Sequence, residues 1–308
     1  SGARILYRGR RRAPLRVAAN RDQVTFESGC VIADQRGATL AHLRLLIFGL
    51  LLLSSVGCAN QMLLFPTTYP IPVDHGARRK VPLSENRTVD VWTARASDAE
   101  PKAFVLRFCG NGERAEYALP TELEEWAGLP VEIWAVNYPG FGASTGPATL
   151  AGVPAAAVAV FGHVRAQHPQ SPILVSGFSM GTTAALYLAA NRPVAGLLLR
   201  SPPPLRQLIM GRYGWWNLWL LAGPVALQVP AQLDSIANAK QCNVPAVFLI
   251  TARDTVIPAD YQRKVAGAYA GPKQVVTAAE GNHNDPLTRS SQRAIRAQIE
   301  WLWTSTIH

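Results

Sequence analysis

Short apolar runs alternate with helical patterns along the chain from about residue 62. The runs are rich in Val, Ile, Leu and aromatic residues, and the segments between them have the apolar spacing of helices. Strands that alternate with helices predict βαβ units and a mainly parallel sheet flanked by helices. The predicted strands are Val89–Arg95, Ala103–Cys109, Val131–Asn137, Ile173–Ser176, Ala195–Arg200, Ala246–Thr251 and Gln274–Thr277. The predicted helices are Leu119–Ala127, Val153–Gln167, Thr182–Ala190, Ala259–Ala270 and Ser291–Trp303.

One stretch, residues 205–243, interrupts this alternation. It contains Trp215, Trp216 and Trp219 within a short helical pattern. Aromatic side chains bury a large apolar area, so core-facing packing is one interpretation. The other is a small lid-like segment that lines an acyl-binding pocket.

A different apolar run precedes the alternating region. Leu45–Val56 (LLIFGLLLLSSV) is about twelve residues long. A membrane-spanning helix needs about 20 such residues, whereas the apolar core of a signal peptide needs roughly 7–15. We therefore expect residues 41–58 to be a signal peptide and residues 1–40 to be a basic, disordered tail or an upstream extension.

The signal-like segment ends in Ser54-Ser55-Val56-Gly57-Cys58. This sequence resembles the bacterial lipobox, in which a cysteine follows a small residue directly after the apolar core. The resemblance implies an exported, membrane-anchored lipoprotein of the bacterial cell envelope, lipidated at Cys58. More than one acyl chain is required for a firm anchor. An uncleaved anchor or a plain signal peptide remains the alternative.

Charge and composition narrow the function classes. The 308 residues carry a net charge of +10, but residues 1–44 alone contain nine arginines and three carboxylates. The remaining chain is nearly balanced and has no basic stripe interleaved with aromatic residues, so we expect no nucleic-acid partner. Hydrophobic residues make up 48% and charged residues 16%, which is typical of a globular protein. One domain over residues 62–308 is the simplest interpretation.

The four cysteines do not have the spacing of a metal site. Cys109 and Cys242 lie in or beside apolar runs, so we expect buried free thiols. A disulfide between them remains an alternative.

The sequence Gly177-Phe178-Ser179-Met180-Gly181 carries the candidate nucleophile. This G-x-S-x-G pattern directly follows the apolar run ILVS and directly precedes the helix-forming TTAALYLAA. A strand, a tight turn and a helix are the setting of a nucleophile elbow, which exposes the serine hydroxyl at the carboxyl edge of the sheet. Glycines at both ends relieve steric clashes in the turn. We predict that Ser179 is the nucleophile.

A serine hydroxyl needs a base to accept its proton. His283 lies in a polar loop, GNHND, between the last predicted strand and the C-terminal helix. The other histidines lie in the signal segment, the N-terminal connection, the helix before the elbow strand, or the chain end. Position and elimination therefore both favour His283 as the general base.

The imidazole in turn needs a carboxylate that fixes its tautomer. Asp254 follows the predicted strand AVFLIT, so it lies at the same carboxyl edge. Asp260 is a weaker candidate because it lies inside a helix that Pro258 starts. Asp285 is close to His283 in sequence, which makes orienting the ring difficult. The order Ser179, Asp254, His283 is that of α/β-hydrolases.

Two backbone amides are required to stabilise the oxyanion of acyl transfer. The first is expected from Met180, directly after the nucleophile. The second is expected from the loop Cys109-Gly110-Asn111-Gly112, with the Asn111 amide as the candidate; a plain glycine-rich turn is the alternative reading of this loop.

These motifs together resemble the α/β-hydrolase superfamily over roughly residues 62–303. The likeness is greatest to the small branch without a large cap, which contains eukaryotic protein depalmitoylases and bacterial lipoprotein hydrolases. It implies a mainly parallel, eight-stranded twisted sheet with a small helical lid segment. FCGNGER resembles the oxyanion segment of that branch, NYPGFGASTG its Tyr-Arg-Gly loop, TARDTVIP its acid loop, GNHND its histidine loop, and Leu233–Ile236 its pattern before the seventh strand.

One position departs from the branch. Cys109 stands where the branch has a histidine that holds the oxyanion loop, and a thiol is a weak hydrogen-bond donor. The departure puts the rigidity of this loop in question, although Gly110 and Asn111 are retained.

The sequence thus predicts a serine hydrolase that cleaves carboxylic esters or thioesters through an acyl-enzyme, with no metal and no cofactor. A serine peptidase for short peptides uses the same triad, but the tryptophan-rich segment carries only Asp234 and lacks an acidic cluster for an α-amine. A non-catalytic lipoprotein scaffold is a third hypothesis, against which the complete triad argues.

Overall fold

The structure is a computed structural model that describes residues 58–74, 76–217, 219–220 and 222–307. The predicted basic tail (residues 1–40) and nearly all of the predicted signal peptide lie outside these residues. Within them, no helix combines the length and the apolar character needed to cross a bilayer.

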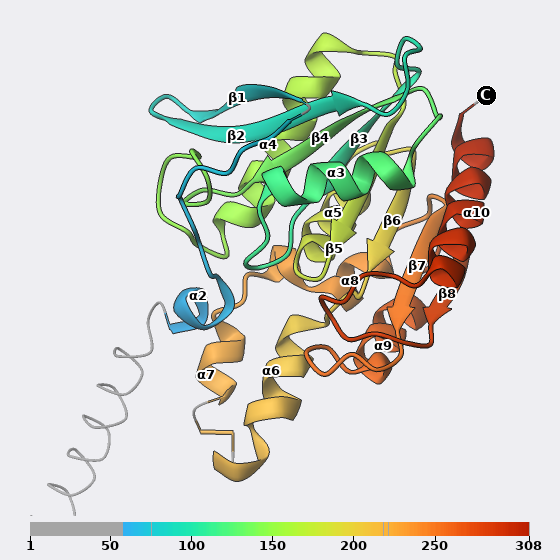
Figure 1. Cartoon of the computed structure of the whole chain (residues 1–308). Coiled ribbons are helices and arrows are strands. Elements are labelled where there is room, and N and C mark those ends of the chain that lie inside the picture. The colour runs from blue at the N-terminus through green and yellow to red at the C-terminus, as the bar shows by residue number, and fades with distance from the viewer. Residues whose placement is uncertain (1–57, 75, 218, 221, 308) are drawn as a thin grey trace, which may run out of the picture. The chain divides into compact units, whose positions relative to one another are not determined.

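Eight strands form one sheet, in the order β1-β2-β4-β3-β5-β6-β7-β8 (Figure 1). The pairs β1/β2 and β2/β4 are antiparallel and all other pairs are parallel, which confirms the predicted fold class. The strands are β1 (Ala77–Ser84), β2 (Arg87–Arg95), β3 (Ala103–Phe108), β4 (Val131–Asn137), β5 (Ile173–Phe178), β6 (Gly196–Arg200), β7 (Ala246–Thr251) and β8 (Lys273–Ala278).

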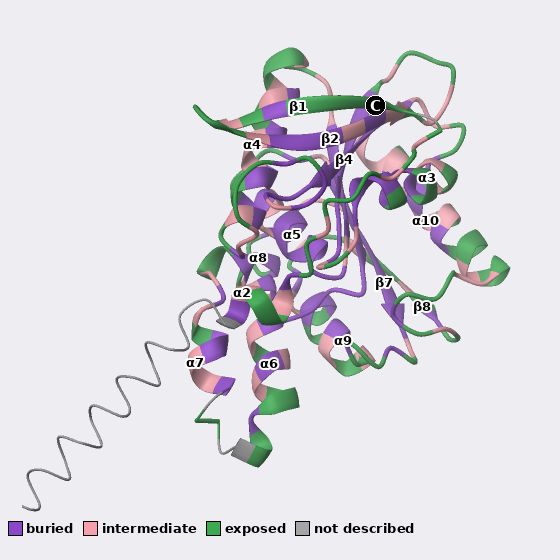
Figure 2. Cartoon of the chain, turned by 60° about the vertical axis from the view of Figure 1, so that its left-hand side comes forward, coloured by how far each residue is buried: buried purple, intermediate pink, exposed green. Residues whose placement is uncertain are grey.

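Helices cover both faces of the sheet. Two of them, α3 and α10, contact each other on one face, and α4, α5, α8 and α9 follow one another across the other face (Figure 2). Their bounds are α3 (Ala115–Glu125), α4 (Gly152–Gln167), α5 (Gly181–Asn191), α8 (Ser235–Ala239), α9 (Ala259–Ala268) and α10 (Arg289–Thr306). The remaining helices are α2 (Cys58–Leu63), α6 (Leu205–Tyr213), η1 (Trp215–Asn217), α7 (Ala222–Leu227) and η2 (Ala231–Leu233).

The burial of the residues in each strand explains which strands could be predicted from the sequence. Every residue of β3, β6 and β7 is buried, as expected of central strands that are packed on both faces. In contrast, only Val81 is buried in the edge strand β1, which is rich in exposed basic residues. This strand has no apolar alternation and was therefore not predicted. Charged side chains on an edge strand also discourage pairing with other chains.

The tryptophan-rich segment forms α6, η1 and α7 between β6 and β7. Trp215, Trp216 and Trp219 have exposed fractions of 70%, 64% and 49%. Of the two interpretations of these tryptophans, core-facing packing is therefore wrong. The chain in this segment buries Leu205 and Ile209 of α6 instead, and leaves the indoles on the surface.

Candidate active site

Ser179 follows β5 and precedes α5, at the carboxyl edge of the sheet. Its φ angle is 52°, in the left-handed region that non-glycine residues rarely adopt. The turn is held by the Ser179 amide, which donates to the Arg200 carbonyl (2.8 Å), and by the Thr182 hydroxyl, which donates to the Ser179 carbonyl (2.7 Å). The predicted strand, tight turn and helix are thus present around this serine.

The two glycines of the motif are required by close backbone packing. A Cβ atom at Gly181 would lie 2.1 Å from the Phe108 carbonyl oxygen, and one at Gly177 would lie 2.7 Å from the Gly181 backbone. The absence of side chains lets α5 start against the end of β3 and therefore fixes where the Ser179 hydroxyl points.

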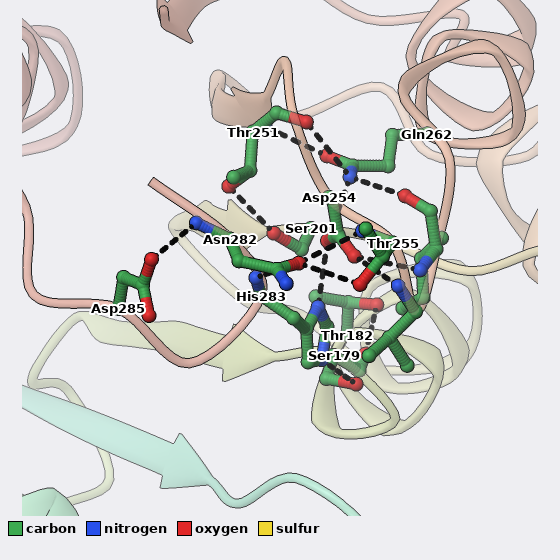
Figure 3. A network of polar contacts seen from close by, with 12 residues as sticks. Ser179, Thr182, Ser201, Thr251, Asp254, Thr255, Gln262, Asn282, His283 and Asp285 are labelled. Atoms are coloured by element: carbon green, nitrogen blue, oxygen red, sulfur yellow. Dashed lines mark hydrogen bonds and ion pairs between the residues drawn. The ribbon is translucent and has the colours of Figure 1, made fainter. Parts of the chain in front are cut away.

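His283 lies in the loop between β8 and α10. Its Nε2 atom is 2.9 Å from Ser179 Oγ, and its Nδ1 atom is 2.6 Å from Asp254 Oδ2 (Figure 3). The ring stacks on Phe178, with 5.0 Å between the ring centroids. The structure therefore brings together the three side chains that the sequence predicted as a triad.

Asp254 lies in the loop after β7 and is buried. Its Oδ1 atom accepts the amides of Val256 (2.8 Å) and Ile257 (2.7 Å), and its Oδ2 atom accepts Gln262 Nε2 (3.0 Å) in addition to the histidine. These donors compensate a buried carboxylate for the water it has lost. Gln262, on α9, was not predicted, because one polar residue within a helical pattern carries no sequence signal.

The rival carboxylates lie elsewhere. Asp260 is exposed on α9 and pairs with Arg263 (3.1 Å), and Asp285 accepts the Asn282 amide (2.7 Å). Asn282 in turn links the acid and histidine loops, because its side-chain oxygen accepts both the amide and the hydroxyl of Thr255. The loops that carry Asp254 and His283 are thus tied to each other.

The two residues predicted to form the oxyanion hole, Asn111 and Met180, line the same small cavity as Ser179. The Asn111 carbonyl accepts the Phe65 amide (2.9 Å), so the segment after α2 holds this loop from outside.

The loop after β3 is also held from inside, without the histidine of the resembled branch. Glu113 accepts the Gly110 amide (2.8 Å) and two bonds from Arg107 (2.8 and 3.1 Å). Cys109 is a buried free thiol, and burial raises its pKa well above the ordinary value. The ion pair between Glu113 and Arg107 therefore holds the loop after β3, whose rigidity the sequence left in question.

A buried charge cluster lies beneath the elbow, between the sheet and α3. Glu122 is 2.8 Å from Arg107 Nε and 3.0 Å from Arg200, and Arg200 also contacts Glu125 and the Ser176 hydroxyl. Burial alone would raise the pKa of Glu122, but Arg200 and Arg107 outweigh it and lower that pKa. The pKa of Glu125 is raised by burial and by Glu122, against the opposing effect of Arg200.

Two cavities of different character meet at the triad. A cavity of about 220 Å³ contains Ser179 and is lined mainly by apolar side chains of α2 and α6, among them Leu63, Leu208 and Ile209. A wider cleft of about 1430 Å³ lies on the His283 side between α3 and α10 and carries charges of both signs, including Glu280 and Arg293. Among the described residues, no group of His, Cys, Asp and Glu is arranged to hold a metal ion.

Comparison with known proteins agrees with this architecture. The family model described as alpha/beta hydrolase fold matches residues 131–240. An uncharacterized protein of Mycobacterium tuberculosis is 27% identical over 239 residues, covering 74% of this chain and 81% of that protein.

Solved structures with the same fold include esterases. The Pyrococcus furiosus esterase Pf2001 superposes with a TM-score of 0.61 at 14% identity, covering 80% of this chain and 99% of its own. Est1E from Butyrivibrio proteoclasticus, solved with ferulic acid, gives 0.61 at 14% identity, with coverages of 74% and 98%. An alpha-beta hydrolase from Vibrio vulnificus gives 0.56 at 20% identity, with coverages of 75% and 81%. The chain has the α/β-hydrolase fold.

Proposed function

We propose that this chain, which has the α/β-hydrolase fold, is a serine hydrolase that cleaves carboxylic esters or thioesters through an acyl-enzyme on Ser179. The observation that carries the proposal is the continuous hydrogen-bonded chain from Ser179 through His283 to Asp254. Three residues from three different loops meet at the carboxyl edge of the sheet, beside an apolar cavity. The presence of esterases among proteins of this fold is consistent with it.

The hydrogen bonds define the tautomer of His283. An ionised carboxylate only accepts hydrogen bonds, so Nδ1 carries the proton shared with Asp254 and Nε2 is free to accept the Ser179 proton. Ser179 Oγ then bonds to the acyl carbon while Nε2 takes its proton, and the carbonyl electrons move onto oxygen. The amides of Met180 and Asn111 are the donors for that oxyanion.

Collapse of the tetrahedral intermediate breaks the bond between the acyl carbon and the leaving oxygen or sulfur. The leaving group takes the proton from His283 Nε2, and the acyl group stays on Ser179. A water molecule then gives a proton to the same nitrogen and attacks the acyl carbon. The acid is released and Ser179 regains its hydrogen.

The two cavities suggest where the parts of the substrate lie. The apolar cavity beside Ser179 is somewhat larger than a cavity of ~150 Å³ that holds benzene, so it suits a short to medium acyl group. The charged cleft on the His283 side suits a polar leaving group. The proposal that the chain belongs to the small branch that includes depalmitoylases and bacterial lipoprotein hydrolases is supported by the sequence resemblance alone.

One observation favours a second candidate, a serine peptidase. The cleft between α3 and α10 contains Glu280 and Asp285 as well as arginines. These carboxylates are candidates to bind the α-amine of a short peptide, a feature absent from the tryptophan-rich segment. The apolar cavity favours the esterase over this alternative.

For the location of the protein, we propose a lipid anchor at Cys58 and export to the bacterial cell envelope. The support is the sequence: an apolar run of signal-peptide length ends at a lipobox-like Gly57-Cys58. Metabolic labelling with an alkyne fatty acid, compared between the wild type and Cys58→Ser, tests this.

The catalytic proposal is tested with a fluorophosphonate probe that bonds covalently to activated serines. We expect labelling of the wild type and of Ser290→Ala, an exposed serine on α10, and loss of labelling in Ser179→Ala. Equal labelling of wild type and Ser179→Ala removes Ser179 from its role. Absence of labelling in all three proteins favours the non-catalytic scaffold.

The substrate class is tested with p-nitrophenyl acetate, butyrate, octanoate and palmitate, the corresponding thioesters, and aminoacyl anilides. The esterase proposal expects a maximum of kcat/KM at a short or medium ester or thioester. A clear preference for the anilides selects the peptidase instead.

A further inference from the structure

The end of the molecule around the small cavity presents an unusual surface of large apolar side chains. Of the twelve large apolar residues that are exposed in the described part of the chain, eight lie on α2 or the segment just after it and on α6, η1, α7 and the turn between them. We call this the tryptophan surface. It consists of Met62, Phe65, Tyr213, Trp215, Trp216, Trp219, Leu220 and Leu227.

These residues form one continuous region because their helices are neighbours. α6 packs on α7 and α7 contacts α2, and both views of the molecule place the three helices side by side (Figures 1 and 2). The Ala59 amide donates to the Gln228 side chain just after α7 (3.3 Å). Contiguous exposed apolar surface is rare on soluble proteins and marks an interaction site.

The tryptophan surface reaches the mouth of the small cavity. Met62, Phe65 and Tyr213 are exposed by 45%, 54% and 41%, and all three also line the cavity that contains Ser179. Whatever covers this surface therefore also faces the opening through which an apolar group reaches the serine.

The charge of this region selects between possible occupants. Residues 58–73 and 203–233 contain two arginines, Arg206 and Arg212, and no carboxylate. Arg206 lies 3.9 Å from Asp234, the residue directly after this range, so Arg212 carries the net positive charge of the region. An apolar surface of net positive charge is complementary to an anionic lipid leaflet, to which each basic residue near the surface adds attraction. Indoles favour the boundary between headgroups and acyl chains, where one edge meets water and the ring meets lipid.

The sequence before α2 points the same way. The apolar run Leu45–Val56 ends two residues before α2, which contributes Met62 to the tryptophan surface. A chain that enters the folded part from an apolar, signal-like segment arrives at this end of the molecule.

We propose that the tryptophan surface docks on an anionic lipid bilayer, so that the mouth of the Ser179 cavity opens toward the lipid. This docking goes beyond an anchor at Cys58, because it involves the catalytic fold itself. Docking of the tryptophan surface on lipid does not depend on the proposed function. Its consequence, that acyl groups enter the cavity from the lipid layer, rests on that function.

The test uses the full chain in vesicles of phosphatidylcholine and phosphatidylglycerol whose acyl chains carry bromine, a quencher of nearby indole fluorescence. Trp215→Phe/Trp216→Phe removes two of the eight tryptophans from the proposed contact while keeping it apolar. Trp301→Phe/Trp303→Phe removes two from α10 and is the matched control. We expect quenching in the wild type, strongest with bromine near the headgroups, and at least about a twofold smaller quenched fraction in the first variant only.

This readout separates docking from anchoring and from catalysis. A lipid-anchored chain whose tryptophan surface faces water gives the same quenched fraction in both variants, which overturns the proposal. A second copy, a protein partner or residues 45–56 covering the surface shields the indoles from bromine and gives that result as well. Retained fluorophosphonate labelling shows that the variants are folded. If neither the wild type nor the variants are labelled while quenching follows the expected pattern, the catalytic proposal fails and the docking proposal stands.

Discussion

The Nε2 atom of His283 lies 2.9 Å from the Oγ atom of Ser179, although 104 positions separate the two residues in the chain. The distance is that of a hydrogen bond, and it is set by two loops at the carboxyl ends of β5 and β8. The stacking of the imidazole on Phe178, next to the serine, restricts the plane of the ring. The consequences of this geometry are measurable.

Asp254→Asn tests the role of the carboxylate. The asparagine amide is able to donate to Nδ1, which favours the wrong histidine tautomer, so we expect kcat to fall by about 10⁴-fold with little change in KM. Asp260→Asn, on the exposed part of α9, is the control and should keep wild-type kinetics. A similar loss in both variants, or none in Asp254→Asn, contradicts the assignment.

Glu113→Gln tests the ion pair that holds the proposed oxyanion loop. The change weakens the bonds to Arg107 and to the Gly110 amide, so we expect kcat to fall by roughly 10–100-fold with the fold intact, since a misplaced oxyanion donor costs up to about 10³. Glu100→Gln, a surface residue paired with Arg95, serves as control. Unchanged kcat in Glu113→Gln shows that the loop is held by other contacts. Fluorophosphonate labelling rates provide an independent readout.

Glu122→Gln and Glu125→Gln should differ in their effect on stability. Glu122 has a lowered pKa in the fold, so its stabilisation is complete above the ordinary pKa of 4.5 and is lost as the pH falls through the folded pKa. Its replacement leaves two buried arginines undercompensated and should lower the free energy of unfolding at neutral pH by about 3 kcal/mol.

The pKa of Glu125 is shifted in the opposite direction to that of Glu122. Its raised pKa means that its contribution is complete below the ordinary pKa of 4.5 and is lost as the pH rises through the folded pKa. Glu125→Gln should therefore destabilise the protein less than Glu122→Gln at neutral pH and flatten the fall in stability above that ordinary value. Urea unfolding of the three proteins over a pH series measures both effects, and identical pH profiles contradict them.

Two glycines in helices give a matched pair for packing. Gly181→Ala places a methyl group against the Phe108 carbonyl oxygen and should cost about 3 kcal/mol or more. Gly162→Ala, on the exposed side of α4 with open space around the new methyl group, should instead stabilise the helix by about 0.5–1 kcal/mol. Thermal unfolding with opposite shifts in Tm is the expected result; shifts of the same sign contradict it.

The small cavity predicts how acyl length is selected. Leu208→Phe fills part of it, so the ratio of kcat/KM for octanoate to that for acetate should fall by about tenfold or more. Leu227→Phe, on the exposed face of α7, is the size-matched control. An unchanged ratio in Leu208→Phe shows that the acyl group lies in the wide cleft instead.

The sequence predicted the parts of the fold that have a strong local pattern. The central strands are continuous apolar runs, and the bounds of β4 and β7 agree with the prediction residue for residue. The elbow was found because a strand, a G-x-S-x-G motif and a helix are contiguous. Asp254 and His283 could be selected because parallel strands bring their carboxyl ends to one edge, so chain order was enough to place both residues near Ser179.

Other features depend on side-chain contacts that leave no pattern in the sequence. Gln262 supports Asp254 from another element, and Glu113 holds the loop after β3 through a bond to the Gly110 amide. The tryptophans of η1 carry the same apolar signal whether they point inward or outward, and only the positions of α6 and α7 decide that they are exposed. The spacing of apolar residues in the sequence does not show whether a given apolar side chain faces the core or the solvent.

The bond between the Phe65 amide and the Asn111 carbonyl has a mechanical consequence. Nearby, the Gly142 amide donates to the Thr67 carbonyl and Arg114 donates to the Tyr69 carbonyl, so residues 65–69 are hydrogen-bonded to the segments that follow β3 and β4. A force applied to the chain before α2 would load these hydrogen bonds before any strand of the sheet. A shortened chain that begins after Tyr69 would keep Ser179, Asp254 and His283 but lose the hydrogen bond from Phe65 that holds the Asn111 loop from outside.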